Sequence, residues 1–132
     1  MDFVYDDGGR AKAGFKGKAS DCVTRAIAIA TGQPYADVYK TINALSGSSV
    51  ARTGVPKDIT KAVMSHYGFA WISTMTIGQG CKTHLVAQEL PKGVLIARLT
   101  RHVCAIKDGV IYDTHNPARG GKRCVYGYWQ LN

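Results

Sequence analysis

Residues 20–32 read SDCVTRAIAIATG and carry the signals of a buried helix. Ser20 and Asp21 are residue types that cap helix N-termini, and Gly32 is the type that ends a helix in the left-handed conformation. Small and apolar residues fill most positions between these ends, which predicts burial of the helix on most sides. Cys22 stands in the first turn, where unpaired backbone N–H groups and the positive end of the helix dipole favour a thiolate.

The rest of the chain divides into helices followed by strands. Apolar residues at helical spacing predict a second helix from Pro34 to Leu45 and a third from Pro56 to Tyr67. The remaining patterns predict strands at 69–74, 94–99, 102–107, 110–114 and 124–129, a short strand at 3–5 in an irregular segment 1–20, and a short helix between Thr83 and Pro91. This order predicts an α+β fold, with N-terminal helices packed on a C-terminal antiparallel β-sheet, in a single domain over residues 1–132.

Composition is that of an ordinary globular protein. The chain has 132 residues, 45% of them hydrophobic and 20% charged, and no apolar run long enough for a membrane span. An acidic N-terminus without a signal-peptide pattern, and four cysteines without a Cys-x-x-Cys motif, predict a cytoplasmic protein whose cysteines are thiols. The even number of cysteines leaves disulfides as the alternative. Cys104 and Cys124 are expected to pack within strands. The formal charge of +8 is spread along the chain, which favours solubility, with weak nucleic-acid binding as the alternative.

A hairpin late in the chain supplies a base for the cysteine. Asp108-Gly109 is the strongest hairpin signal in the sequence. If it forms a two-residue turn, the side chain of His102 on one strand shares a face with that of Asp113 on the other. Asp113 would then fix the tautomer of the imidazole, and a register slip of one residue would give that role to Asn116. We therefore predict Cys22 as nucleophile, His102 as base, and Asp113 or Asn116 as the orienting residue.

Four stretches resemble a family of small phage and prophage proteins with a papain-like cysteine peptidase signature: residues 5–10, 21–32, 102–114 and 123–129. The likeness covers nearly the whole chain. More distantly, the Asp-Cys helix start and the His-led hairpin are similar to bacteriocin-leader peptidases and cell-wall endopeptidases of the papain superfamily. The resemblance implies a papain-like fold, a phage origin and action in the host cytoplasm.

The predicted oxyanion site departs from the papain-like pattern. Such enzymes usually carry Gln or Asn about six residues before the cysteine as a second oxyanion donor. That position here is Lys16, and neither residue type occurs between Met1 and Cys22. The Cys22 N–H is one expected donor, and Lys16, Ser20 or a loop amide is the second. The expected substrate or oxyanion contacts are Lys16, Ser20, Asp21, Gln79 (if its Gly-rich loop folds over the cleft) and His115.

Two functions from different classes are compatible with these residues. The first is a cysteine hydrolase (peptidase, isopeptidase or amidase) that acts on a protein or peptide through an acyl-enzyme, with no cofactor and no metal. The second is a catalytically inactive relative that binds a host protein or nucleic acid. The lysine at position 16, in place of Gln or Asn, and the charge of +8 favour this alternative. A zinc site from Cys81, His84, His102 and Cys104 is a weaker alternative, because no fixed ligand spacing joins these residues.

Overall fold

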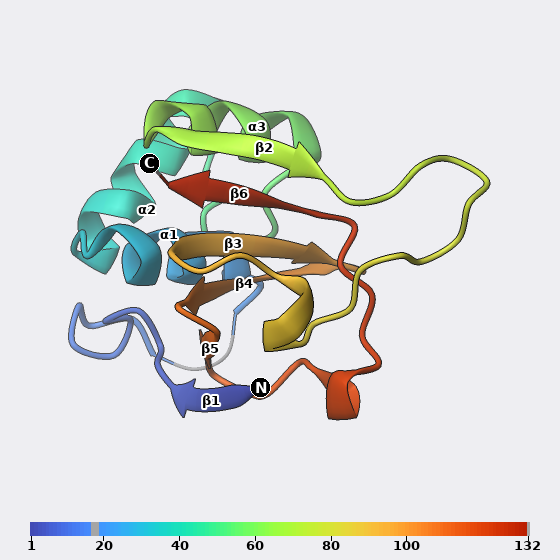
Figure 1. The fold of residues 1–132 in the computed structure, drawn as a ribbon. Coiled ribbons are helices and arrows are strands. Elements are labelled where there is room, and N and C mark those ends of the chain that lie inside the picture. The colour runs from blue at the N-terminus through green and yellow to red at the C-terminus, as the bar shows by residue number, and fades with distance from the viewer. Residues whose placement is uncertain (17–18, 132) are drawn as a thin grey trace.

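The computed structural model of the protein describes residues 1–16 and 19–131 (Figure 1). Within them, the helices are α1 (Cys22–Thr31), α2 (Tyr35–Ser46) and α3 (Lys57–His66), with short 3-10 helices η1 (Ala87–Glu89) and η2 (Arg119–Gly121). The strands are β1 (Asp2–Tyr5), β2 (Phe69–Ser73), β3 (Val94–Leu99), β4 (His102–Lys107), β5 (Val110–Asp113) and β6 (Gly127–Leu131). Residues 17 and 18 of the predicted N-terminal loop lie outside the described residues. No helix among the described residues has both the length and the apolarity to cross a bilayer.

The strands of the described residues form one mixed sheet in the order β1-β5-β4-β3-β6-β2. Neighbours run antiparallel except β1 and β5, which are parallel, with Phe3 opposite Ile111. The α+β class is therefore confirmed. The strands that follow the helices pair antiparallel, but the sheet as a whole is mixed, because the N-terminal β1 joins it parallel to β5. β1 has only four residues, and so short a strand carries no sequence signal for its direction.

The sheet separates two cores (Figure 1). The helices lie on one face, and α1 packs against β4. Residues of α2, α3 and the sheet close this first core around α1, among them Val38, Ile42, Val63, Met64, Ile96 and Trp129. Loop segments cover the opposite face with Leu85, Leu90, Ala118 and Val125. Because residues 23–30 of α1 are all buried, the start of this helix is held firmly beside the sheet.

The hairpin between β4 and β5 has the predicted register. Lys107 pairs with Val110, and the ladder continues to Ala105 opposite Tyr112. Asp108-Gly109 forms the turn, with φ values of 47° and 81°, which is the left-handed backbone that a type I′ turn requires. The turn chemistry thus determines which residues stand at the far end of the two strands.

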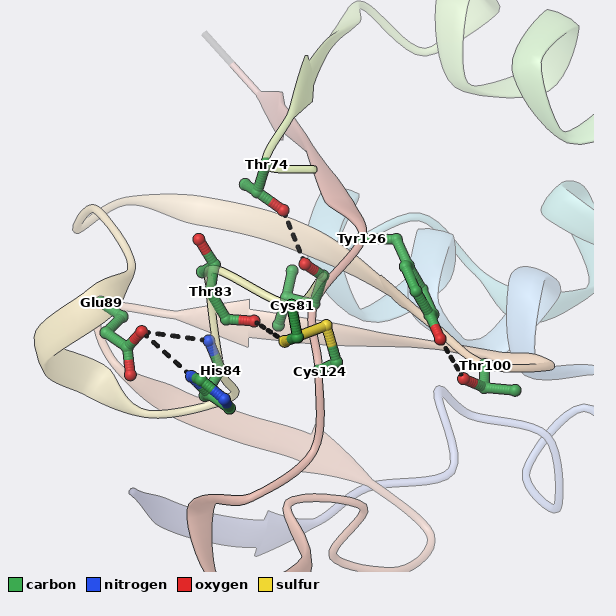
Figure 2. The surroundings of a disulfide bond; sticks show 9 residues. Thr74, Cys81, Thr83, His84, Glu89, Thr100, Cys124 and Tyr126 are labelled. Carbon is green, nitrogen blue, oxygen red and sulfur yellow. Dashed lines mark hydrogen bonds and ion pairs between the residues drawn. A yellow bond between two sulfur atoms is a disulfide. The ribbon is translucent and has the colours of Figure 1, made fainter. Parts of the chain in front are cut away.

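A disulfide between Cys81 and Cys124 ties the loop after β2 to the segment before β6, across a sequence separation of 43 (Figure 2). Hydrogen bonds flank it on both segments. The carbonyl of Thr83 accepts from the N–H of Val125 at 2.8 Å, and the hydroxyl of Thr74 donates to the Val125 carbonyl at 2.6 Å. The disulfide and these hydrogen bonds therefore attach the loop after β2 to the segment that leads into β6.

This disulfide corrects two expectations. The chain does not carry four thiols, because only Cys22 and Cys104 are free. Cys124 is not a packing residue inside the last strand, since β6 begins at Gly127. The spacing of Cys81 and Cys124 shows no motif, and only the path of the loop brings their sulfurs together.

Candidate active site

Cys22 is the first residue of α1, and its side chain is partly exposed. Asp21 precedes it at the N-cap position without a side-chain cap hydrogen bond. The N–H of Arg25 bonds to the Asp21 carbonyl at 2.9 Å, so the amides of the first turn, including that of Cys22, have no carbonyl partner inside the helix. The thiol therefore lies at a helix end that favours negative charge.

His102 lies between the Cys22 thiol and the Asp113 carboxylate. It is the first residue of β4, and Asp113 is the last of β5. Its Nε2 is hydrogen-bonded to Oδ2 of Asp113 at 2.6 Å, and its side chain is also hydrogen-bonded to the thiol. Because Nε2 faces Asp113, Nδ1 is the ring nitrogen available to the sulfur. The backbone N–H of Val103 donates a further hydrogen bond to this sulfur.

The surroundings of Cys22 favour its thiolate. Burial alone would raise the pKa of this thiol. The hydrogen bond and charge of His102, the N–H of Val103 and the charge of Arg25 outweigh burial, so the pKa of Cys22 lies below its ordinary value. By contrast, burial raises the pKa of Cys104, the other free thiol, which is 1% exposed. The two free cysteines are thus chemically distinct.

The pKa values of His102 and Asp113 shift in opposite directions, and both shifts favour the charged form. Burial would lower the pKa of His102, but the hydrogen bonds and charges of Asp113 and Cys22 raise it to about 9. Burial would raise the pKa of Asp113, yet His102, the N–H of Thr114 and the charge of Arg25 hold it below the ordinary value. A lowered thiol pKa beside a raised imidazole pKa favours a thiolate–imidazolium pair over the neutral pair.

A buried arginine holds the carboxylate of Asp113. Arg25 of α1 is 6% exposed, and it donates from Nη1 to Asp113 Oδ1 at 2.6 Å and from Nε to Asp21 Oδ1 at 2.9 Å. Asp21 also accepts from Arg10 at 3.2 Å and from the Tyr35 hydroxyl at 2.7 Å. Burial would lower the pKa of Arg25, but the two carboxylates raise it. The result is a connected polar network between α1 and β5.

A cleft of about 780 Å³ opens beside the thiol, a size typical of ligand sites. The start of α1, the turn between β3 and β4 and the segment after β5 line it. Besides Cys22 and His102, its lining includes Tyr5, Arg10, Ser20, Val55, Arg98, Arg101, Thr114 and His115. The nucleophile candidate is therefore accessible from a surface depression.

Three of the predicted contact residues line this cleft. The ring centroid of His115 lies 5.1 Å from that of His102, and Ser20 stands just before α1, paired through its backbone with Thr53. Asp21 also borders the cleft, but its carboxylate accepts the hydrogen bonds of Arg25 and cannot donate to an oxyanion. Asp21 is thus an anchor for Arg25 rather than an oxyanion contact.

Three other predicted residues lie elsewhere. The side chain of Asn116 accepts the N–H of Ala118 at 3.0 Å, so Asp113 rather than Asn116 orients the imidazole. Lys16 is exposed and does not line the cleft, and its carbonyl accepts from Arg52. Gln79 is exposed in the loop after β2, which extends away from the helices (Figure 1), so this loop does not fold over the cleft.

One side-chain cluster among the described residues has the donors for a metal ion. Ligand atoms of His102, Asp113 and His115 lie within 4.8 Å of one another. However, Oδ2 of Asp113 is already hydrogen-bonded to His102, and an ion would have to replace that bond. The alternative zinc set is not assembled, because Cys81 is in the disulfide and Cys104 is buried.

Arg25 is not among the site residues predicted from the sequence. A signal was present, since a charged residue in a helix that is buried on most sides must find a partner. The N–H of Val103 has no such signal, because every backbone amide except that of proline offers the same donor. Its position beside the sulfur depends only on how β4 meets α1.

No protein-family model, curated protein or solved structure matches this chain. The resemblance to phage papain-like proteins stays a prediction, and the function is inferred from the site itself.

Proposed function

We propose that the protein is a papain-like cysteine hydrolase that cleaves an amide bond of a protein or peptide through an acyl-enzyme. The observation that carries this proposal is the position of His102, hydrogen-bonded to the Cys22 thiol on one side and to Asp113 on the other. Along the chain, nucleophile, base and orienting residue stand in the order Cys, His and Asp, which is the papain-like order. The site also opens to a cleft and favours the thiolate.

In the proposed reaction, the Cys22 thiolate attacks the carbonyl carbon of the scissile amide. The negative charge that develops on oxygen is stabilised by the Cys22 N–H at the start of α1. The proton of the His102 imidazolium passes to the leaving amine as the C–N bond breaks, which leaves a thioester. Water then attacks the thioester, His102 accepts one of its protons, and the C–S bond breaks to release the acid and the thiolate.

The second oxyanion donor is part of the proposal. Of the side chains predicted for this role, Ser20 lines the cleft and Lys16 does not. A hydroxyl is a competent donor to an oxyanion. We therefore assign the second donor to Ser20.

The direct test is alkylation of Cys22 at neutral pH, followed by mass spectrometry. We expect iodoacetamide to modify Cys22 first, since its pKa is lowered while Cys104 is buried and the other two cysteines form a disulfide. The matched variant His102→Ala keeps the Cys22 thiol but removes its base. Equal rates of Cys22 alkylation in the wild type and in His102→Ala would contradict the proposal.

One observation favours a second candidate function, that of an inactive papain-like protein that binds a partner. Lys16, at the position of the usual upstream donor, lies outside the cleft. If the second candidate is right, a Cys22→Ala variant keeps the full biological effect. Loss of the effect in that variant supports the hydrolase.

Phage origin and a cytoplasmic location also remain proposals. The disulfide speaks against a reducing compartment, because disulfides persist mainly in oxidising environments. Alkylation of protein taken directly from the producing cell, before any oxidation, decides this point. Free Cys81 and Cys124 would support the cytoplasm, and a closed disulfide would exclude it.

A further inference from the structure

A second cavity of about 570 Å³ adjoins the cleft. It lies between the first turns of α3 and the end of the sheet formed by β2, β3 and β6. Its charged and aromatic lining consists of Lys57, Lys61, Arg98, Arg101, Trp71 and Trp129, together with Tyr126. Arg98 and Arg101 line both cavities. We call this second cavity the basic groove; it and the cleft share a wall.

The charge of the basic groove is uncompensated. Lys57, Lys61, Arg98 and Arg101 form no ion pair with any carboxylate in the part of the chain that the structure describes. No described acidic residue lines the groove. The acid that lines the neighbouring cleft, Asp21, is already paired with two arginines. Four unpaired cations around one depression favour an anionic occupant.

Two tryptophans that contact each other form the aromatic wall of the groove. The ring centroids of Trp71 and Trp129 lie 4.6 Å apart, and the guanidinium of Arg98 lies 5.9 Å from the Trp129 ring centroid. Trp71 covers the backbone of Gly127, where an added Cβ would overlap its ring. Trp71 nevertheless remains 43% exposed, so the groove offers an apolar face as well as charge.

Arg101 is held at the junction by an unusual backbone. It lies in the two-residue turn between β3 and β4, directly before His102, and has a φ of 55°. Residues other than glycine rarely adopt this left-handed conformation, and Asn or Gly is the usual choice in such turns. The arginine at this position lines both the groove and the cleft that holds His102.

We propose that the basic groove binds acidic side chains of a peptide substrate, close to the carbonyl that Cys22 attacks. This proposal rests on the proposed function, since it names the substrate class of that same site. Because Arg98 and Arg101 line both cavities, a peptide seated in the groove has a direct route into the cleft beside the thiol. An amide carbonyl suits the thiolate–imidazolium pair, whereas a nucleic acid offers phosphates to the cations but no peptide bond to the thiol.

The chain contains only two tryptophans, Trp71 and Trp129, and both line the groove. Intrinsic fluorescence therefore reports on occupancy directly. We would titrate Cys22→Ala protein with acetylated, amidated octapeptides of Ala and Gly that carry two adjacent Glu residues, and with matched peptides that carry Gln. The Glu peptides are expected to bind about tenfold more tightly, and less so at high salt.

Two double variants with the same net charge locate the effect. Lys57→Gln with Lys61→Gln removes charge from the groove, whereas Lys40→Gln with Lys92→Gln removes it from exposed positions that line neither cavity. Only the first pair is expected to weaken binding of the Glu peptides, by about tenfold. Equal weakening in both pairs, or equal affinity for Glu and Gln peptides, would overturn the proposal.

A single-stranded oligonucleotide with the same number of negative charges serves as the competing ligand. Tighter binding of the oligonucleotide than of the Glu peptide would also overturn the assignment to peptides. Because the titration uses Cys22→Ala, it does not depend on catalysis. Failure of Cys22 alkylation with intact peptide binding therefore refutes the hydrolase alone, and the reverse result refutes the basic groove alone.

Discussion

The Nη1 of Arg25 lies 2.6 Å from Oδ1 of Asp113, although 88 residues separate the two in sequence. The other oxygen of the same carboxylate holds His102. One buried aspartate therefore accepts from a helix on one oxygen and orients the imidazole with the other. The position of His102 relative to Cys22 is thus tied to α1, the helix that carries the thiol.

Loss of the Arg25 cation is expected to destabilise the fold. Arg25→Gln removes one charged partner from each of the buried carboxylates of Asp21 and Asp113, and removal of one member of a buried ion pair costs about 3–5 kcal/mol. Denaturant unfolding at pH 7 would measure the loss. Lys92→Gln, which removes the same charge from an exposed position, is the control. An Arg25→Gln protein as stable as this control would contradict the role of the network.

Two substitutions test whether Asp113 or Asn116 orients the His102 imidazole. Asp113→Asn keeps the shape of the side chain but removes the charge that raises the pKa of His102. We expect Cys22 alkylation at pH 7 to slow, by about tenfold for each pH unit by which the thiol pKa comes to lie above 7. Asn116→Ala should leave the rate unchanged, because its side chain bonds to Ala118. The opposite pattern would restore Asn116 as the orienting residue.

The pH profile of Cys22 alkylation follows from the shifted pKa values. The pKa of the Cys22 thiol is lowered by its contacts with His102 and Val103, so the reactive thiolate forms at lower pH than in an ordinary cysteine. The pKa of His102 is raised to about 9, so the imidazolium that stabilises this thiolate persists up to that pH. In His102→Ala, burial dominates and the rise in rate should move to higher pH. Stopped-flow alkylation between about pH 5 and 10 would measure both profiles; identical profiles would refute the pairing.

We expect the disulfide to stabilise the fold but to have no effect on the reactivity of Cys22. With a sequence separation of 43, the chain-entropy model gives a loss of about 4 kcal/mol for Cys81→Ser with Cys124→Ser. Neither cysteine lines the cleft, so the rate of Cys22 alkylation should be unchanged in the folded double variant. Thermal unfolding and alkylation would be measured side by side. A large loss of Cys22 reactivity in protein that is still folded would show that the disulfide acts on the site.

The sequence alone predicted the elements whose signals are local. A buried helix beginning at Cys22 follows from its capping residues and glycine stop, and the hairpin register follows from Asp108-Gly109. These two features already place a cysteine at a helix start and put His102 and Asp113 at one end of the hairpin. Such signals are readable because helix period and turn chemistry act over only a few residues.

Tertiary structure alone decided what depends on distant segments. The parallel pairing of β1, the disulfide and the positions of Lys16 and Gln79 outside the cleft have no local signal. The ion pair of Arg25 with Asp113 and the basic groove both join residues from helices, strands and turns that are far apart in the chain. Packing of the two cores sets these contacts, and packing depends on all the segments at once rather than on the residues of any one of them.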